Sequence, residues 1–151
     1  MNRKHLRVMG LAIAVLFLMS GLAIADQARQ ATISNLGGEV LVRQGQGHWQ
    51  SAQMGMVLNV GDELKTANGA FAEITLDQGQ VGTVKVDQGS LFKIDSMDSN
   101  PATGDKNTLL DLAIGKVLVH AGKLQGDSKF EVRTPTSTTG VRGTVFEVSV
   151  E

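Results

Sequence analysis

Side chains that could carry out chemistry are few and scattered in this 151-residue chain. Cysteine is absent, and beyond the N-terminal segment the histidines are His48 and His120, neither in a nucleophile motif. Two carboxylates can act as an acid–base pair only where the fold brings them together. Four lie on or at the ends of alternating segments, with no spacing that aligns two of them: Glu73, Asp77, Asp87 and Asp111. We therefore predict no enzymatic activity.

One polar run contains the oxygen atoms that a calcium ion prefers, Asp95-Ser96-Met97-Asp98-Ser99-Asn100. It lacks the glycine at the sixth loop position and the closing glutamate of an EF-hand. We interpret residues 95–107, which include Pro101 and Gly104, as a polar and mobile loop. The sequence predicts no metal site and no cofactor.

Two single residues are candidates for ligand contact. Trp49 follows the turn 45–48 and either covers the end of a core or forms a stacking platform for a sugar. Arg142, between Val141 and Gly143, is expected to be partly buried and would then need a carboxylate such as Asp62. Such a pair would tie the last strand to the sheet. The alternative is an exposed Arg142 that binds a partner.

Period-two alternation dominates the chain outside its N-terminal segment. Apolar and polar residues alternate in segments 39–43, 63–66, 70–77, 83–87, 109–114, 129–133 and 144–150. Alternation of this kind is typical of strands with one buried face. Glycines separate the segments at short intervals, and no helical stripe of comparable quality is present. We predict an all-β fold, a single domain of short strands with a solenoid-like or rolled architecture, preceded by a signal-peptide helix.

The first 25 residues have the order of a secretory signal peptide. Arg3, Lys4 and Arg7 precede an apolar run that ends near Leu22, and Ala23-Ile24-Ala25 provides a small-residue cleavage site. The run is short for a membrane span, which needs about 20 apolar residues. We expect cleavage before Asp26, a lead-in over residues 26–37 and a β domain over residues 38–151. Contact with the membrane is expected only if this segment stays uncleaved.

Charge excludes one class of partner. The chain has 14 basic and 15 acidic residues, and removal of the signal leaves 11 basic side chains and a formal charge of −4. Nucleic-acid surfaces need clustered Lys and Arg. We therefore expect no nucleic-acid binding by the periplasmic or secreted protein.

An ordered set of motifs resembles the FecR domain family from about Gly38 to Val150. The set is GEVLVRQG (38–45) with Trp49 after it, VGDELKT (60–66), GAFAEITLDQG (69–79), LAIGKV (112–117), FEVRTP (130–135) and GVRGTVF (140–146). Each motif alone is weak, but their order and spacing are specific. The motif positions that we single out, as structural residues or partner contacts, are Gly61, Asp62, Thr134, Pro135, Gly140, Arg142, Gly143, Thr144 and Phe146.

The resemblance implies a periplasmic all-β module. Signalling members of the family regulate iron uptake from the inner membrane, with a cytoplasmic anti-sigma segment and contact to a TonB-dependent receptor. This sequence has only seven residues before its apolar run and ends at Glu151. We therefore expect neither an anti-sigma segment nor a further receptor-docking domain.

The functional hypothesis is a non-enzymatic exported module that binds a protein or another envelope component, with a role in envelope signalling. The alternatives are a peptidoglycan or polysaccharide binder that uses Trp49, and a membrane-anchored regulator that lacks the anti-sigma segment.

Overall fold

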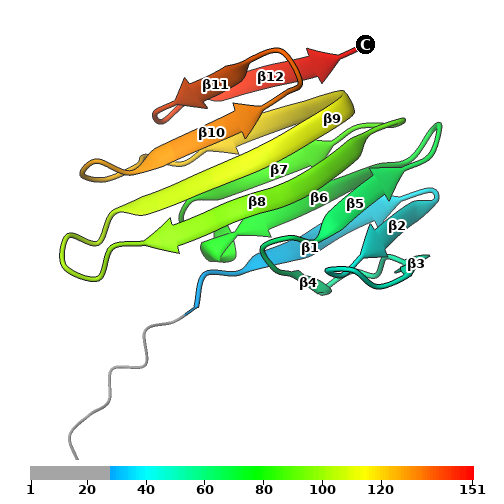
Figure 1. The fold of residues 1–151 in the computed structure, drawn as a ribbon, viewed down its shortest axis with the longest axis horizontal. Coiled ribbons are helices and arrows are strands. Elements are labelled where there is room, and N and C mark those ends of the chain that lie inside the picture. The colour runs from blue at the N-terminus through cyan, green and yellow to red at the C-terminus, as the bar shows by residue number, and fades with distance from the viewer. Residues whose placement is uncertain (1–27) are drawn as a thin grey trace, which may run out of the picture.

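Strands make up nearly all of residues 28–151, the part of the chain that the computed structural model describes (Figure 1). They form one sheet of 12 strands that folds over on itself into two facing layers. The predicted all-β class with a rolled architecture is confirmed. The predicted signal peptide lies outside the described residues. No helix within residues 28–151 is long and apolar enough to cross a membrane.

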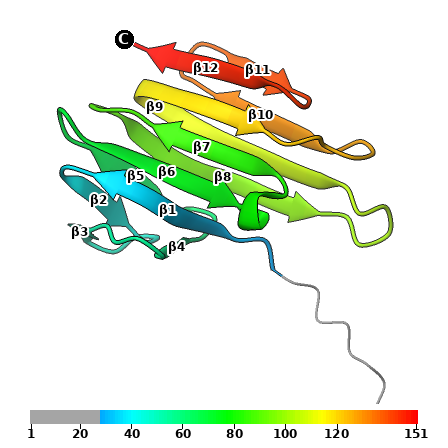
Figure 2. The same cartoon turned by 180° about the vertical axis from the view of Figure 1, so that it is seen from behind.

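The long strand β9 (Lys106–Ala121) belongs to both layers, with one half in each (Figure 2). Layer A contains, in spatial order, β4 (Val57–Leu58), β1 (Ala31–Gly37), β6 (Phe71–Leu76), β7 (Gly82–Val86), the second half of β9, and β12 (Val145–Val150). Layer B contains β3 (Trp49–Ser51), β2 (Val40–Arg43), β5 (Glu63–Thr66), β8 (Leu91–Ser99), the first half of β9, β10 (Lys129–Arg133) and β11 (Thr138–Val141). Neighbouring strands are antiparallel except β9 and β10, which are parallel.

The core lies between the two layers because each strand turns its apolar residues inward. Val42, Leu64 and Phe92 of layer B and Ile74 and Val84 of layer A are at most 1% exposed. They belong to one cluster of buried side chains, while the polar residues that alternate with them face outward. Stability in the absence of any cysteine thus rests on this apolar burial and on backbone pairing.

Glycine corners carry the chain from one layer to the other at one end of the sandwich. Gly38, Gly69, Gly89 and Gly115 all have positive φ and lie where a strand of one layer leads into the other. The corners bond to each other: Ala67 donates its N–H to the Glu39 carbonyl at 3.0 Å. At the opposite end, the 3-10 turn η1 (Asp77–Gly79) joins β6 to β7 within layer A.

Two local predictions were wrong. Ile114 was expected on the same buried face as Leu110 and Leu112, yet it is 49% exposed. A bulge between Leu91 and Phe92 of β8 leaves one extra residue in β9 and shifts the alternation before the corner. Residues 95–107 were expected to form a loop, but β8 continues to Ser99 and β9 begins at Lys106, leaving a short turn.

Candidate binding surface

The outer face of layer B carries a continuous row of directly opposed side chains across seven strands, from β3 to β11. Its members, in spatial order, are Trp49, Arg43, Glu63, Lys93, Asp111, Arg133 and Thr138. Neighbours in this row are Cα partners, so their side chains point to the same face. Between its two ends the sign of charge alternates at every strand. We call this set the charged row; it spans about 29 Å at the usual strand spacing.

Close contacts fix the first part of the row. The Arg43 guanidinium lies 5.0 Å from the centre of the Trp49 ring, and its Nε donates to Glu63 Oε2 at 2.9 Å. A second nitrogen of Arg43 bonds to the same carboxylate oxygen. Trp49 is 37% exposed on an edge strand, so it does not cover the end of the core.

A bidentate ion pair fixes the other part. Arg133 donates from Nε and Nη2 to the two carboxylate oxygens of Asp111, at 2.6 and 2.7 Å. Its guanidinium also lies 3.1 Å from Asp95, which in turn lies 3.9 Å from the Lys93 ammonium. The hydrogen bonds to Asp111 raise the pKa of Arg133 above its ordinary value. The same hydrogen bonds fix the direction of the Arg133 guanidinium at the surface.

An apolar cleft of about 270 Å³ opens within the row. Leu91, Phe92, Leu112, Ala113 and Pro135 supply its apolar walls, and its charged walls come from the row itself. The volume is below the range of about 300–1,000 Å³ that is typical of small-molecule sites. Its size and its ring of fixed charges suit one apolar side chain of a partner.

The turn that ends at Pro135 is held by its own hydroxyl groups. Thr134 donates its N–H to the Ser137 carbonyl at 2.7 Å, and its Oγ1 accepts the Ser137 N–H at 3.0 Å. Because β10 ends at Arg133, this turn places Pro135 against the cleft beside the arginine. Of the family-motif residues singled out from sequence, Thr134 and Pro135 thus line the candidate surface.

Asp62 is a buried structural residue of the same layer. It is 5% exposed, and its two carboxylate oxygens accept the Gly45 and Asn59 N–H groups at 2.9 and 2.8 Å. Gly61, with φ of 92°, donates its N–H to the Ile94 carbonyl of β8 at 2.8 Å. Together they hold the β2–β3 turn that positions Arg43 and Trp49.

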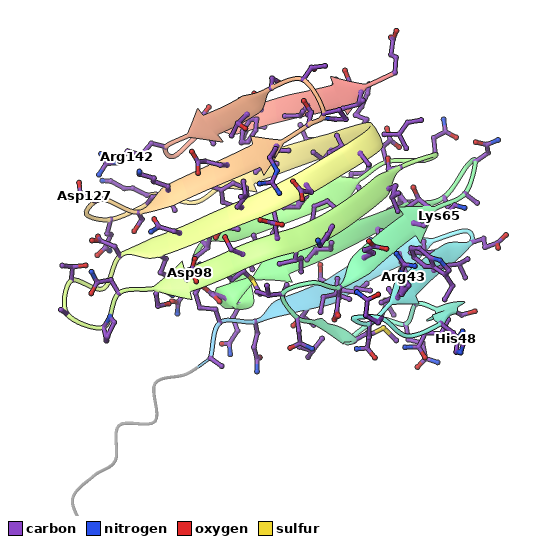
Figure 3. The ribbon with its side chains drawn as sticks, in the orientation of Figure 1. Arg43, His48, Lys65, Asp98, Asp127 and Arg142 are labelled. Atoms are coloured by element: carbon purple, nitrogen blue, oxygen red, sulfur yellow. The ribbon has the colours of Figure 1, made fainter. Side chains whose placement is uncertain are left out.

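The expected pairing of Arg142 with Asp62 was wrong. Arg142 is exposed and bonds to the Gly126 carbonyl, and Figure 3 places it near Asp127, at the opposite end of the molecule from Arg43. Four other motif residues lie near it around β11 and β12, away from the cleft: Gly140, Gly143, Thr144 and Phe146. The half-buried Phe146 packs on the core, and the Thr144 carbonyl accepts the Ala121 N–H at 3.0 Å.

Sequence reasoning missed two groups of residues. The charged row depends on strand register, which alternation within single segments does not indicate. The second group is an internal ion pair, in which Arg29 Nε donates to Asp77 Oδ2 at 2.8 Å with both side chains less than 10% exposed. Within residues 28–151, no group of His, Asp and Glu side chains is arranged to hold a metal ion.

Comparison with known proteins gave one finding. The family model described as FecR protein matches residues 62–151, which includes every strand from β5 onward and both halves of the cleft. No curated protein and no solved structure matches the chain.

Proposed function

The chain belongs to the FecR family, and from that membership we propose that it is an exported module that binds an envelope protein through the charged row and its apolar cleft. The family is associated with envelope signalling and regulation. The finer statement, that this face binds a protein, rests on one observation: an apolar cleft surrounded by charges of alternating sign that ion pairs hold in place.

Protein interfaces combine an apolar anchor in a pocket with complementary charges around it, and their most important residues are often Trp and Arg. The row supplies Trp49, Arg43 and Arg133 on rigid strands, with each arginine already oriented by a carboxylate. The side chains therefore lose little conformational entropy when a partner binds. Alternating charge also selects a partner by register, because a shift of one strand would oppose like charges.

A pair of matched charge reversals tests this proposal. Lys93→Glu on the row and Lys85→Glu on the outer face of layer A each place a glutamate opposite an existing one, Glu63 and Glu73 respectively. Lys93 also faces Asp111 and lies near Asp95, so Lys93→Glu carries the larger cost to the sheet, and the two variants are compared at a temperature at which both are folded. After crosslinking in the envelope and affinity capture, we expect Lys93→Glu to lose a stoichiometric partner that Lys85→Glu keeps.

Blocking the cleft gives a second test of the proposed binding surface. Ala113 lines the cleft and is exposed, so Ala113→Arg fills it without removing a charge of the row. We expect the same partner to be lost. Equal recovery of partners by all three variants, at equal thermal stability, would show that this face is not the binding surface.

The glycan alternative has weaker support, because the Arg43 guanidinium already lies over the Trp49 ring that a sugar would stack on. Pelleting with insoluble peptidoglycan compares the two ideas. Binding that disappears in a folded Trp49→Ala variant, with no protein partner captured, would favour the glycan.

We also propose that residues 1–25 are a signal peptide cleaved before Asp26, that residues 26–37 lead into the β domain, and that the mature protein is periplasmic or secreted. The intact mass of the exported protein checks this directly. A mass that retains the apolar run would instead support the membrane-anchored regulator.

A further inference from the structure

Strand β12 is the longest edge strand of the described sandwich. The four edges are β4 with 2 residues, β3 with 3, β11 with 4 and β12 with 6. Within residues 28–151, β12 pairs only with β9, so its outer edge is open. Edge strands are commonly protected by lysine, proline or a bulge. The β12 sequence, Val145-Phe146-Glu147-Val148-Ser149-Val150, contains no lysine and no proline. Its register with β9 is unbroken, so it has no bulge.

The hydrogen bonds between β9 and β12 show which backbone groups of β12 point away from the sheet at its open edge. The Ala121 N–H bonds to the Thr144 carbonyl, and these residues would be partners in the same register. Hydrogen-bonded pairs alternate along an antiparallel ladder, so Phe146, Val148 and Val150 bond to β9. The N–H and C=O groups of Val145, Glu147 and Ser149 therefore point outward.

The two faces of β12 restrict the strand that could be added. Val148 is 9% exposed, and Phe146 and Val150 are half-buried against the core, whereas Val145 is 57% exposed and alternates with them. An added strand must place apolar residues opposite the inward set and polar residues opposite Glu147 and Ser149. The strand β12 itself has this pattern.

Charge selects one register for two copies of β12 related by a two-fold axis. With the axis at Val148, Glu147 faces Ser149 of the other copy, Phe146 faces Val150, and Val148 faces itself. With the axis at Glu147 the two Glu147 side chains are opposed, and with the axis at Ser149 Glu147 opposes Glu151. Like charges that directly face each other destabilise a sheet. The register centred on Val148 avoids both conflicts and covers the half-buried Phe146 and Val150.

We propose that this protein forms a homodimer in which β12 pairs antiparallel with β12 of a second copy about a two-fold axis at Val148, so that layer A continues across both copies. The surface is separate from the charged row in layer B, so the dimer leaves that row free and does not depend on the function proposed for it.

Opposite substitutions at one exposed position test the register. In the dimer, Ser149 of each copy faces Glu147 of the other copy, so this pair occurs twice by symmetry. Ser149→Lys should therefore tighten the dimer and Ser149→Glu should weaken it, each by roughly fivefold from the two cross-strand pairs. Sedimentation equilibrium of the exported protein measures both. A monomeric wild-type protein at its highest soluble concentration, or equal dissociation constants for the two variants, would overturn the proposal.

A single introduced thiol gives an independent measurement, because the chain has no cysteine. Val148→Cys places two thiols directly opposite at the axis, in a non-hydrogen-bonded pair whose Cα atoms lie about 4.5 Å apart, within the Cα separation of about 4.4–6.8 Å that a disulfide spans. We expect oxidation to give a covalent dimer for Val148→Cys and much less for Ser149→Cys, whose thiol faces Glu147. Equal crosslinking of the two variants would contradict an axis at Val148.

Discussion

At the scale of single residues, Asp62 shows how a motif position can support the charged row without belonging to it. Its buried carboxylate accepts backbone N–H groups from both ends of the segment that carries β3. A carboxylate in this position replaces water for two donors at once. The charged row therefore depends on Asp62 at its Trp49 end, although Asp62 itself is hidden from a partner.

Asp62→Ala should lower the free energy of unfolding by about 2 kcal/mol, because two backbone donors lose a charged acceptor. Chemical denaturation measures the change, and Trp49 fluorescence reports the local loosening of β3. Asp98→Ala is the control, because Asp98 is exposed and its carboxylate makes no hydrogen bond to residues 28–151. Losses of equal size in the two variants would contradict the role assigned to Asp62.

The sequence identified Asp62 and Gly61 as motif positions, but it did not show which contacts they make. The sequence suggested that a partly buried Arg142 needed a carboxylate, and Asp62 was the candidate. Backbone N–H groups are equally good hydrogen-bond donors to a carboxylate. Every residue except proline carries one, so residue types do not reveal which of them bond to Asp62. Thr134 and Pro135 were singled out as motif positions, but their place beside Arg133 follows from the β10–β11 turn, which only the structure reveals.

At the scale of elements, the corner at Gly115 allows β9 to serve both layers. Gly115 has φ of 97°, and a Cβ there would lie 2.5 Å from the Ser90 Cα and 2.6 Å from its Cβ. Ser90 is buried, and its Oγ accepts the Lys116 N–H at 3.0 Å. The start of β8 thus packs directly against the bend of β9, and no side chain fits between them.

Gly115→Ala should destabilise the protein by clearly more than Gly69→Ala. Both residues lie at corners with positive φ, so both substitutions carry a backbone cost of about 1–3 kcal/mol. A Cβ at Gly69 would meet no atom within 4 Å, whereas one at Gly115 would overlap Ser90. The difference in melting temperature between the two variants isolates the contact with Ser90. Equal melting temperatures would show that Ser90 moves aside freely.

Alternation predicted six of the strands well, because one buried face is a local property of sequence. The sequence pattern Gly-x-Val-Leu-Val occurs twice, at residues 38–42 and 115–119. Both motifs begin at a corner between the layers. What alternation could not predict is register. The bulge at Leu91 and Phe92, the exposure of Ile114 and the charged row all depend on which residues of different strands face each other.

At the scale of the whole molecule, Arg29 joins the two layers at the end opposite the glycine corners. Besides its ion pair with Asp77 of η1, next to layer A, it donates to the Asn107 carbonyl and to Thr108 Oγ1 of β9, at 2.6 and 2.7 Å. These two acceptors lie in the half of β9 that belongs to layer B. The corners connect the layers covalently at one end, and Arg29 connects them non-covalently at the other. No sequence pattern indicated this contact, because its partners are 48 to 79 positions apart.

This connection should make stability depend on acid pH. Burial alone would raise the pKa of Asp77, but the hydrogen bonds from Arg29 and the Gln30 N–H, with the charges of Arg29 and Lys106, lower it below its ordinary 3.8. The folded state therefore holds the proton more weakly than the unfolded state. Stability from Asp77 is complete above the unfolded-state pKa and is lost as pH falls through the lower, folded-state pKa.

Asp77→Asn separates this contribution from those of other carboxylates. The variant leaves a buried guanidinium without its counterion, so at neutral pH we expect a loss of about 3 kcal/mol in the free energy of unfolding. As pH falls below about 4 the wild-type protein loses the same contribution, so the two unfolding curves should converge. Urea denaturation between pH 7 and pH 2 measures the gap. A gap of constant size would mean that Asp77 is not held ionised by Arg29, and that the hydrogen bonds from Arg29 to β9 join the two layers at this end without help from the ion pair.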